Sequence, residues 1–180
     1  MVNFSFMKSA GCLLIILLLF VSCVGNKKSE VIQKKKMTAV KKFIPSFDYE
    51  ELAPFLHKDN DKIYVVNFWA TWCAPCVKEL PAFEKIKSNF QSKNVEVLLV
   101  SLDFPEQIDT KLRAFLVRKK IQSEVVVLND PDQDVWIPKI NKDWSGAIPA
   151  TLIYSKNKRV FFERSFEYES LEKEVLKFLK

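Results

Sequence analysis

The apolar and polar positions of the chain change their pattern near residue 43, where runs typical of a globular core begin. Three runs rich in β-branched and aromatic residues predict buried strands, and two further runs around a turn at Asn157 predict a hairpin. The predicted strands cover residues 62–70, 95–103 and 124–130, followed by the stretches ATLIYSK and RVFFERS.

Segments with a helical period lie between these strands. A short helix is predicted over 46–56, with Ser46 as its cap and acidic residues in its first turn. Further helices are predicted over 75–90, 106–120 and 169–180, with a short helix or turn over 132–140. The alternation of strands and helices predicts an α/β domain with a central mixed sheet that helices flank on both faces.

The N-terminus has a different character. Residues 12–21 are continuously apolar, but this is only about half the length that spans a bilayer, as in the core of a signal peptide. The run ends in FVSC (20–23), which resembles the cleavage site of bacterial lipoproteins, although Phe20 replaces the usual leucine. We therefore predict a signal peptide over 1–22 and lipidation of Cys23, while an ordinary signal peptide and an uncleaved anchor remain alternatives.

The net charge of +6 comes largely from a lysine-rich tract after this leader. Residues 23–42 have no apolar period and no interleaved aromatic residues, which predicts a solvated linker that could also be attracted weakly to acidic lipids. Nucleic acid is therefore not an expected partner. The remaining residues, 43–180, form the predicted globular domain.

Cys73 and Cys76 form a CxxC motif between a predicted strand and a predicted helix. A cysteine at a helix N-terminus faces unpaired N–H groups and the positive end of the helix dipole, which stabilise a thiolate. Such a position can lower the pKa of a cysteine from about 8.5 to roughly 3.5–7.5. Cys73 is therefore the candidate nucleophile, and Cys76, one turn into the helix, is the candidate resolving thiol.

A zinc site and a purely structural disulfide fit the CxxC motif less well. A structural zinc site needs about four ligands, and His57 is the only histidine that could join Cys73 and Cys76. A structural disulfide that closes so small a loop would add little stability. We expect neither a metal nor a cofactor.

The stretch VVNFWATWCAPCVKELP (65–81), together with AIPATLIY (147–154), resembles the extracytoplasmic thioredoxin-like proteins of the TlpA and ResA type. The resemblance covers residues 45–180. It rests on Trp72 directly before the first cysteine, Pro75 before the second, Pro81 five residues on, and Pro149 before a later strand. It implies a thioredoxin fold and a thiol–disulfide oxidoreductase.

The same resemblance implies roles for individual residues. Trp72 would shield the disulfide and form part of the substrate surface, with Ile148 and Pro149 presenting backbone groups to an extended substrate segment. The Ile148–Pro149 bond is then expected to be cis, although Pro149 could also be an ordinary proline at a strand start. Trp144, which leads into this loop, could line the same groove or simply pack in the core.

One position departs from cytosolic thioredoxins, which carry a buried aspartate directly before the Phe-Trp pair. Here that residue is Asn67, which cannot exchange a proton. Glu79 follows Cys76 by about one helical turn, and proteins of the ResA type have a glutamate at this position. If it is partly buried, Glu79 would have a raised pKa and could carry the proton of Cys76. The alternative is an exposed carboxylate that pairs with Lys78 or a nearby lysine.

Together these features predict a membrane-anchored, extracytoplasmic enzyme of the bacterial periplasm or cell envelope that contributes to cell redox homeostasis. The resemblance further implies that it reduces protein disulfides, with cytochrome c maturation as a candidate process, and that it receives electrons from a membrane dithiol protein. An oxidase or isomerase of disulfides is the first alternative. A non-catalytic binding module tethered as a lipoprotein is the second.

Overall fold

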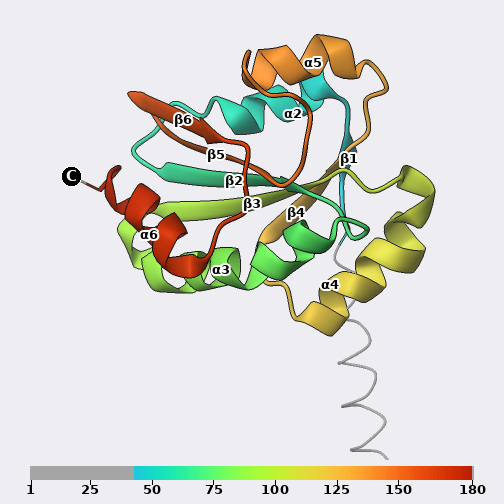
Figure 1. Cartoon of the computed structure of the whole chain (residues 1–180), viewed down its shortest axis with the longest axis horizontal. Helices are drawn as coiled ribbons and strands as arrows, with labels where there is room; N and C mark the ends of the chain where they lie inside the picture. The colour runs from blue at the N-terminus through green and yellow to red at the C-terminus, as the bar shows by residue number, and fades with distance from the viewer. Residues whose placement is uncertain (1–42, 180) are drawn as a thin grey trace, which may run out of the picture. The chain divides into compact units, whose positions relative to one another are not determined.

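The computed structural model describes residues 43–179. In this part of the chain one sheet has the strand order β1-β4-β3-β2-β5-β6 (Figure 1). The strands are β1 (Ser46–Phe47), β2 (Ile63–Trp69), β3 (Val95–Ser101), β4 (Glu124–Leu128), β5 (Ala150–Ser155) and β6 (Lys158–Phe162). The first four are parallel, while β5 runs antiparallel to β2 and to β6, so the sheet is mixed as predicted.

Helices cover both faces of this sheet. They are α2 (Tyr49–Leu56), α3 (Ala74–Phe90), α4 (Arg113–Lys119), α5 (Gln133–Ile140) and α6 (Tyr168–Leu176). Figure 1 shows α2 and α5 on one face, and α3, α4 and α6 on the other. Each face has its own apolar cluster, so the core consists of two layers that the sheet separates.

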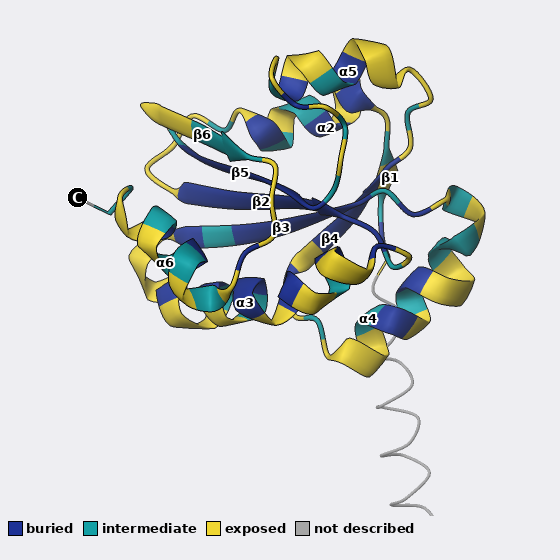
Figure 2. Ribbon diagram, in the orientation of Figure 1, coloured by how far each residue is buried: buried dark blue, intermediate teal, exposed yellow. Residues whose placement is uncertain are grey.

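The central strand β2 positions the site. All seven of its residues are buried, because β3 and β5 flank it and helices cover both its faces (Figure 2). Its side chains alternate between the two clusters, with Val65 on the side of α3 and Val66 on the side of α2. The turn that follows Trp69 therefore lies at the end of the sheet where the parallel strands have their C-termini.

The first predicted helix starts later than expected. Ser46 is not its cap, because Ser46 and Phe47 pair with β4 as the edge strand β1. The cap is Asp48, whose Oδ1 accepts from the Glu51 N–H at 2.9 Å while Glu51 Oε2 accepts from the Asp48 N–H at 3.2 Å. This reciprocal capping box starts α2 at Tyr49.

The helix predicted over 106–120 is only partly α-helical. A 3₁₀ turn (η3, Pro105–Gln107) and one turn of π-helix (η4, Ile108–Leu112) precede α4. No side-chain cap hydrogen bond closes the start of this segment. The apolar face is nevertheless as predicted, since Leu112 and Phe115 are buried.

The predicted signal peptide, Cys23 and the lysine-rich linker lie outside the described residues. Among the helices between residues 43 and 179, none has the length and apolar character needed to cross a bilayer.

Candidate active site

The CxxC motif lies at the start of α3, just after the turn that follows β2. Cys73 is the N-cap of α3, and its Sγ accepts a hydrogen bond from the Cys76 N–H at 3.3 Å. Pro75 occupies the first turn of the helix, where its missing N–H costs nothing. Cys73 and Cys76 are joined by a disulfide, with 5.3 Å between their Cα atoms. The predicted position of the pair at a helix N-terminus is confirmed.

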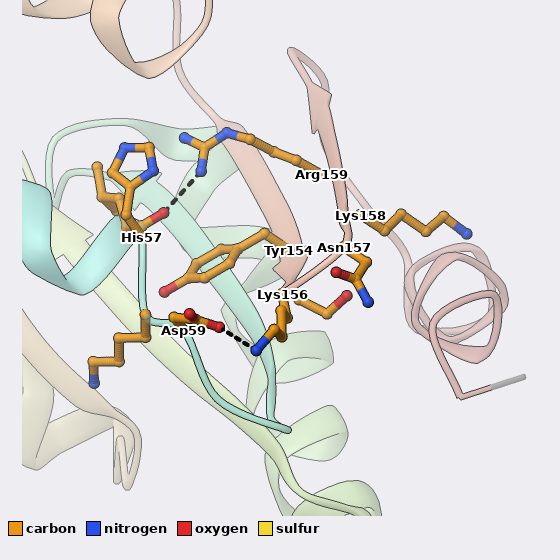
Figure 3. Close-up of a pocket in the computed structure, with 10 residues that line it drawn as sticks. His57, Asp59, Tyr154, Lys156, Asn157, Lys158 and Arg159 are labelled. Carbon is orange, nitrogen blue, oxygen red and sulfur yellow. Dashed lines mark hydrogen bonds and ion pairs between the residues drawn. The ribbon is translucent and has the colours of Figure 1, made fainter.

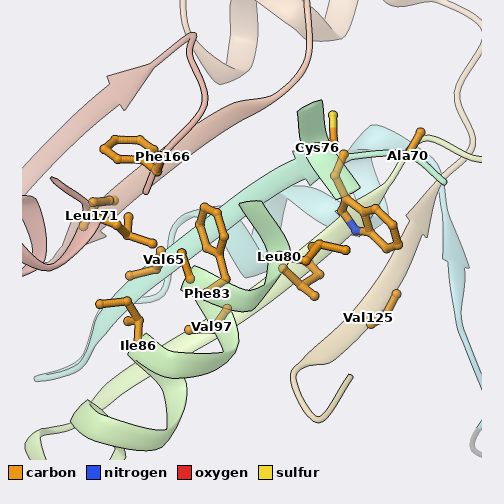
Figure 4. Close-up of a cluster of buried hydrophobic side chains, with 14 of the residues drawn as sticks. Val65, Ala70, Cys76, Leu80, Phe83, Ile86, Val97, Val125, Phe166 and Leu171 are labelled. Atoms are coloured by element: carbon orange, nitrogen blue, oxygen red, sulfur yellow. The ribbon is translucent and has the colours of Figure 1, made fainter. Parts of the chain in front are cut away.

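The two cysteines differ in their access to solvent. Cys76 is fully buried at the end of an apolar cluster that continues along α3 through Leu80 and Phe83 (Figure 4). Cys73 keeps 7% of its surface exposed, and its neighbour Trp72 is 59% exposed. A substrate sulfur can therefore approach Cys73 but not Cys76.

The loop that faces the pair contains a cis peptide bond between Ile148 and Pro149, as expected. The carbonyl oxygen of Ile148 lies 3.8 Å from Cys73 Sγ. In the reduced protein this oxygen is placed to accept the S–H of Cys73. Pro149 is buried and leads directly into β5, whose first residue, Ala150, pairs with Phe68 of β2.

Two hydrogen bonds and one glycine fix the conformation of this loop. Trp144 Nε1 donates to the Ala147 carbonyl at 2.8 Å, and the Ser145 N–H donates to Glu163 Oε2 at 3.1 Å. Gly146 has a φ of +89°, and a Cβ there would lie 3.0 Å from a methyl carbon of Ile137, so glycine is required. Trp144 is buried among aromatic side chains, which favours packing over a place in the substrate groove.

Glu79 is buried beneath the helix N-terminus, with 3% of its surface exposed. Its Oε1 accepts from Asn67 Nδ2 at 2.8 Å, and its Oε2 accepts from the Phe166 N–H at 2.8 Å. Burial raises the pKa of Glu79 to about 7, although the two hydrogen bonds favour the charged form. Lys78 pairs instead with Glu167 on the surface, so the alternative of an exposed Glu79–Lys78 pair is wrong.

Asn67 holds Glu79 from the centre of the sheet. Besides Glu79, its Nδ2 approaches the Ala150 carbonyl and Thr151 Oγ1, each at 3.3 Å. Its Oδ1 is buried and has no partner in the described part of the chain. The amide thus offers a donor to the carboxylate but cannot itself exchange a proton, so Glu79 is the titrating group at this position.

Sequence reasoning did not identify the groups that complete this arrangement. Phe166 contributes only a backbone N–H, which no side-chain pattern reveals. Asp103 is buried behind Thr71 and accepts from the Thr71 N–H at 3.0 Å. The signal for Asp103 was an acidic residue at the end of a buried strand, next to the strand that precedes the cysteines.

A surface hollow of about 440 Å³ lies away from the cysteines, between the end of α2 and the β5–β6 turn (Figure 3). His57, the C-cap of α2, belongs to it and therefore does not join the CxxC motif. The Arg159 guanidinium donates to the Leu56 carbonyl, and Lys156 pairs with Asp59. Nowhere in residues 43–179 do three or more His, Cys, Asp or Glu side chains gather in an arrangement that could hold a metal ion.

Comparison with known proteins places this site in a family. A model of the AhpC/TSA family matches residues 44–162, so the chain belongs to that family. Thiol-disulfide oxidoreductase ResA of Geobacillus thermodenitrificans is 28% identical over 150 residues, which cover 81% of each protein.

Solved structures of other proteins share the fold of this chain. A secreted thiol-disulfide isomerase from Corynebacterium glutamicum has a TM-score of 0.57 at 19% identity, over 71% of this chain and 74% of that one. A thiol:disulfide interchange protein from Chlorobium tepidum TLS has a TM-score of 0.55 at 19% identity, over 67% of this chain and 81% of that one. The predicted thioredoxin fold and the resemblance to ResA are confirmed, and the chain is a thiol–disulfide oxidoreductase.

Glu79→Gln is expected to remove a pH-dependence of stability. The pKa of Glu79 is raised from 4.5 to about 7 in the folded protein, so folding binds a proton. The contribution of Glu79 to the free energy of unfolding is complete at pH values below its pKa in the unfolded chain, and it is lost as pH rises through about 7. Between about pH 5 and about pH 8 the free energy of unfolding of the oxidised wild type should fall by on the order of 2 kcal/mol relative to Glu79→Gln.

Urea unfolding of the two oxidised proteins across this pH range measures the difference. Glu84→Gln is the matched control, since Glu84 also lies on α3 and accepts two backbone N–H groups, but at a partly exposed position. Parallel stability curves for the wild type and Glu79→Gln would show that Glu79 does not titrate near neutral pH.

Proposed function

We propose that this oxidoreductase is a membrane-anchored, extracytoplasmic reductase of protein disulfides. The observation that carries the proposal is the disulfide at the N-terminus of α3, with the buried acid Glu79 one helical turn beyond Cys76. A helix N-terminus stabilises the thiolate of Cys73, and a buried acid can move the proton of a buried thiol.

The reduction takes place in two exchanges. The Cys73 thiolate attacks one sulfur of a substrate disulfide, so that a bond forms between Cys73 and the substrate while the other substrate sulfur leaves as a thiolate. Cys76 then attacks Cys73 Sγ, which closes the Cys73–Cys76 disulfide and releases the second substrate thiol. The substrate gains the electron pair that the two cysteines lose.

Glu79 is the proposed base for the second exchange. Cys76 is buried, and burial among apolar side chains holds a thiol in its neutral form. Residues three apart on a helix are neighbours, so the Glu79 carboxylate can take the proton of Cys76 as it attacks. With a pKa of about 7, Glu79 is present in both protonation states at neutral pH, as a group that accepts and returns a proton must be.

Trp72, Ile148 and Pro149 are the proposed substrate contacts. Trp72 is exposed beside Cys73, and the Ile148 carbonyl faces its sulfur. An extended substrate segment can lie between them and pair with the backbone of the cis-proline loop.

The cellular setting rests on the N-terminal sequence and the relatives. We propose that the signal peptide over 1–22 is removed, that Cys23 carries the lipid, and that the linker over 23–42 holds the domain over 43–180 away from the membrane. The disulfides of the proposed substrates form and persist in oxidising compartments outside the cytoplasm, and the structural neighbour from Corynebacterium glutamicum is a secreted protein. The ResA resemblance supports apocytochrome c thiols as products and a membrane dithiol protein as electron donor.

Trapping of mixed disulfides in single-cysteine variants tests the order of the two exchanges. Cys76→Ser should accumulate disulfide-linked adducts of substrate proteins through Cys73, because the resolving thiol is missing. Cys73→Ser should accumulate almost none, since the remaining Cys76 is buried. Non-reducing gels followed by mass spectrometry measure both, with the double variant as control. Adducts through Cys76, or the absence of adducts in cells, would contradict an enzymatic role with Cys73 as nucleophile.

Glu79→Gln tests the proton transfer. Resolution of a preformed Cys73–peptide disulfide should speed up in the wild type as pH rises through about 7, because the Glu79 carboxylate becomes available as a base. The Gln variant should lose this step and be slower at neutral pH by on the order of 100-fold. Stopped-flow release of the peptide thiol measures the rate. An unchanged pH profile would remove Glu79 from the chemistry and leave the cysteine roles intact.

The reduction potential tests the direction of electron flow. A reductase should have a potential below about −200 mV, since more oxidising pairs favour disulfide formation in substrates. Equilibration with glutathione or dithiothreitol buffers, followed by thiol alkylation, gives the value. A potential well above this limit, together with oxidative refolding of a scrambled protein, would favour the oxidase or isomerase.

A further inference from the structure

Two of the large exposed apolar side chains in the described part of the chain belong to loops at the CxxC end of the sheet. Trp72 and Phe104 are each 59% exposed, whereas most aromatic side chains of residues 43–179 are buried or half-buried. Trp72 directly precedes Cys73, while Phe104 lies in the loop after β3, more than thirty residues away in sequence. The sequence pattern alone did not identify Phe104.

Backbone contacts hold these two loops side by side. The Leu102 N–H donates to the Trp69 carbonyl at 2.8 Å, just beyond the last register pair of β2 and β3. One step further, the Thr71 N–H donates to Asp103 Oδ2 at 3.0 Å. Trp72 and Phe104 each come directly after a member of this second contact, so the two aromatic residues stand on adjacent loops, one of which leads directly into Cys73.

The contact between the loops is rigid because Asp103 is buried and fully bonded. Its carboxylate accepts from the Thr71 hydroxyl and, at 2.7 Å, from Ser101 Oγ, in addition to the Thr71 N–H. Its own N–H donates to Ser101 Oγ at 3.1 Å. Phe104 itself has extended backbone angles and is followed by Pro105, which lacks an N–H and begins η3. The loop therefore presents Phe104 to solvent from a fixed backbone.

The chemistry at Cys73 supplies a partner that can contact this exposed phenylalanine. In the mixed disulfide the substrate cysteine is bonded to Cys73 Sγ, so the residues that flank it must lie over the surface around Cys73. An extended chain advances about 3.3–3.6 Å per residue, so side chains two or three residues from the substrate cysteine reach neighbouring loops.

We infer that Phe104 is a specificity residue, which together with Trp72 contacts an apolar side chain near the cysteine of an extended polypeptide substrate. This inference rests on the proposed thiol–disulfide exchange at Cys73. Phe104 takes no part in that exchange; it adds apolar contact area when the flanking residue of the substrate is hydrophobic. The substrate class is therefore an unfolded or extended chain with an apolar residue close to its cysteine.

The test uses two probes that differ at a single residue. Each is a disulfide-linked dimer of a short peptide, with either Leu or Ser two positions from its cysteine, and oxidised glutathione serves as the small disulfide. In every case the two electrons pass from Cys73 and Cys76 to the probe, which is released as two thiols. Single-turnover oxidation of the reduced protein, followed by tryptophan fluorescence or alkylation, gives the second-order rate constants.

The wild type should prefer the Leu peptide to the Ser peptide. Phe104→Ala should slow the Leu peptide about fivefold, as expected for the loss of one partly buried aromatic contact, and leave the Ser peptide and glutathione rates unchanged. Phe104→Leu should retain most of the preference. Phe43→Ala is the matched control, because Phe43 is 79% exposed but lies before β1, at the outer edge of the sheet.

The outcomes distinguish a failure of the role inferred for Phe104 from a failure of the proposed exchange at Cys73. A Leu preference that Phe104→Ala leaves intact, or an equal loss with all three probes, would overturn the role of Phe104 while exchange at Cys73 stands. Failure of the wild type to react with any probe, including glutathione, would overturn the proposed function itself and the inference with it.

Discussion

The carboxylate of Glu79 lies inside the core between two N–H donors, Asn67 Nδ2 on β2 and the Phe166 backbone before α6. Burial of a carboxylate is costly unless its oxygens are hydrogen-bonded, and both oxygens are. The arrangement joins the central strand, the helix that carries the cysteines, and the segment that leads into α6. The same burial raises the pKa of Glu79 to about 7, so one group contributes to the packing of the site and to its proposed proton chemistry.

Around this contact the site is assembled from loops at one end of the sheet. The turn after β2 carries Cys73, the loop before β5 brings the Ile148 carbonyl to its sulfur, and the loop after β3 is bonded to Thr71 through Asp103. The buried Asp103 holds the loop after β3, and the Trp144 indole N–H, which donates to the Ala147 carbonyl, holds the loop before β5. A reactive sulfur is thus surrounded by a surface whose backbone is fixed while Trp72 remains open to solvent, which is the combination that exchange with large substrates requires.

Contacts between residues distant in the chain decided two of the points that sequence reasoning missed or left open, Ser46 and Trp144. Ser46 has the right residue type for a helix cap, but pairing with β4 draws it into the sheet, and Asp48 caps the helix instead. The period over 106–120 correctly identified Leu112 and Phe115 as core residues, yet it could not reveal the 3₁₀ and π turns that precede α4. Trp144 was ambiguous because its role depends on neighbours from β2, α5 and β6.

Apart from the edge strand β1, the sequence by itself determined the order of strands and helices, the mixed sheet, and the position of Cys73 at a helix N-terminus, because these follow from local periodicity, capping and the spacing within CxxC. It also indicated Glu79, since one helical turn from Cys76 is a local relation. Only the tertiary structure decided that Glu79 is buried, that Asn67 and the Phe166 N–H hold it, and that Asp103 joins the loops of Trp72 and Phe104. These depend on contacts between residues far apart in the chain, whose desolvation and hydrogen bonding no local pattern records.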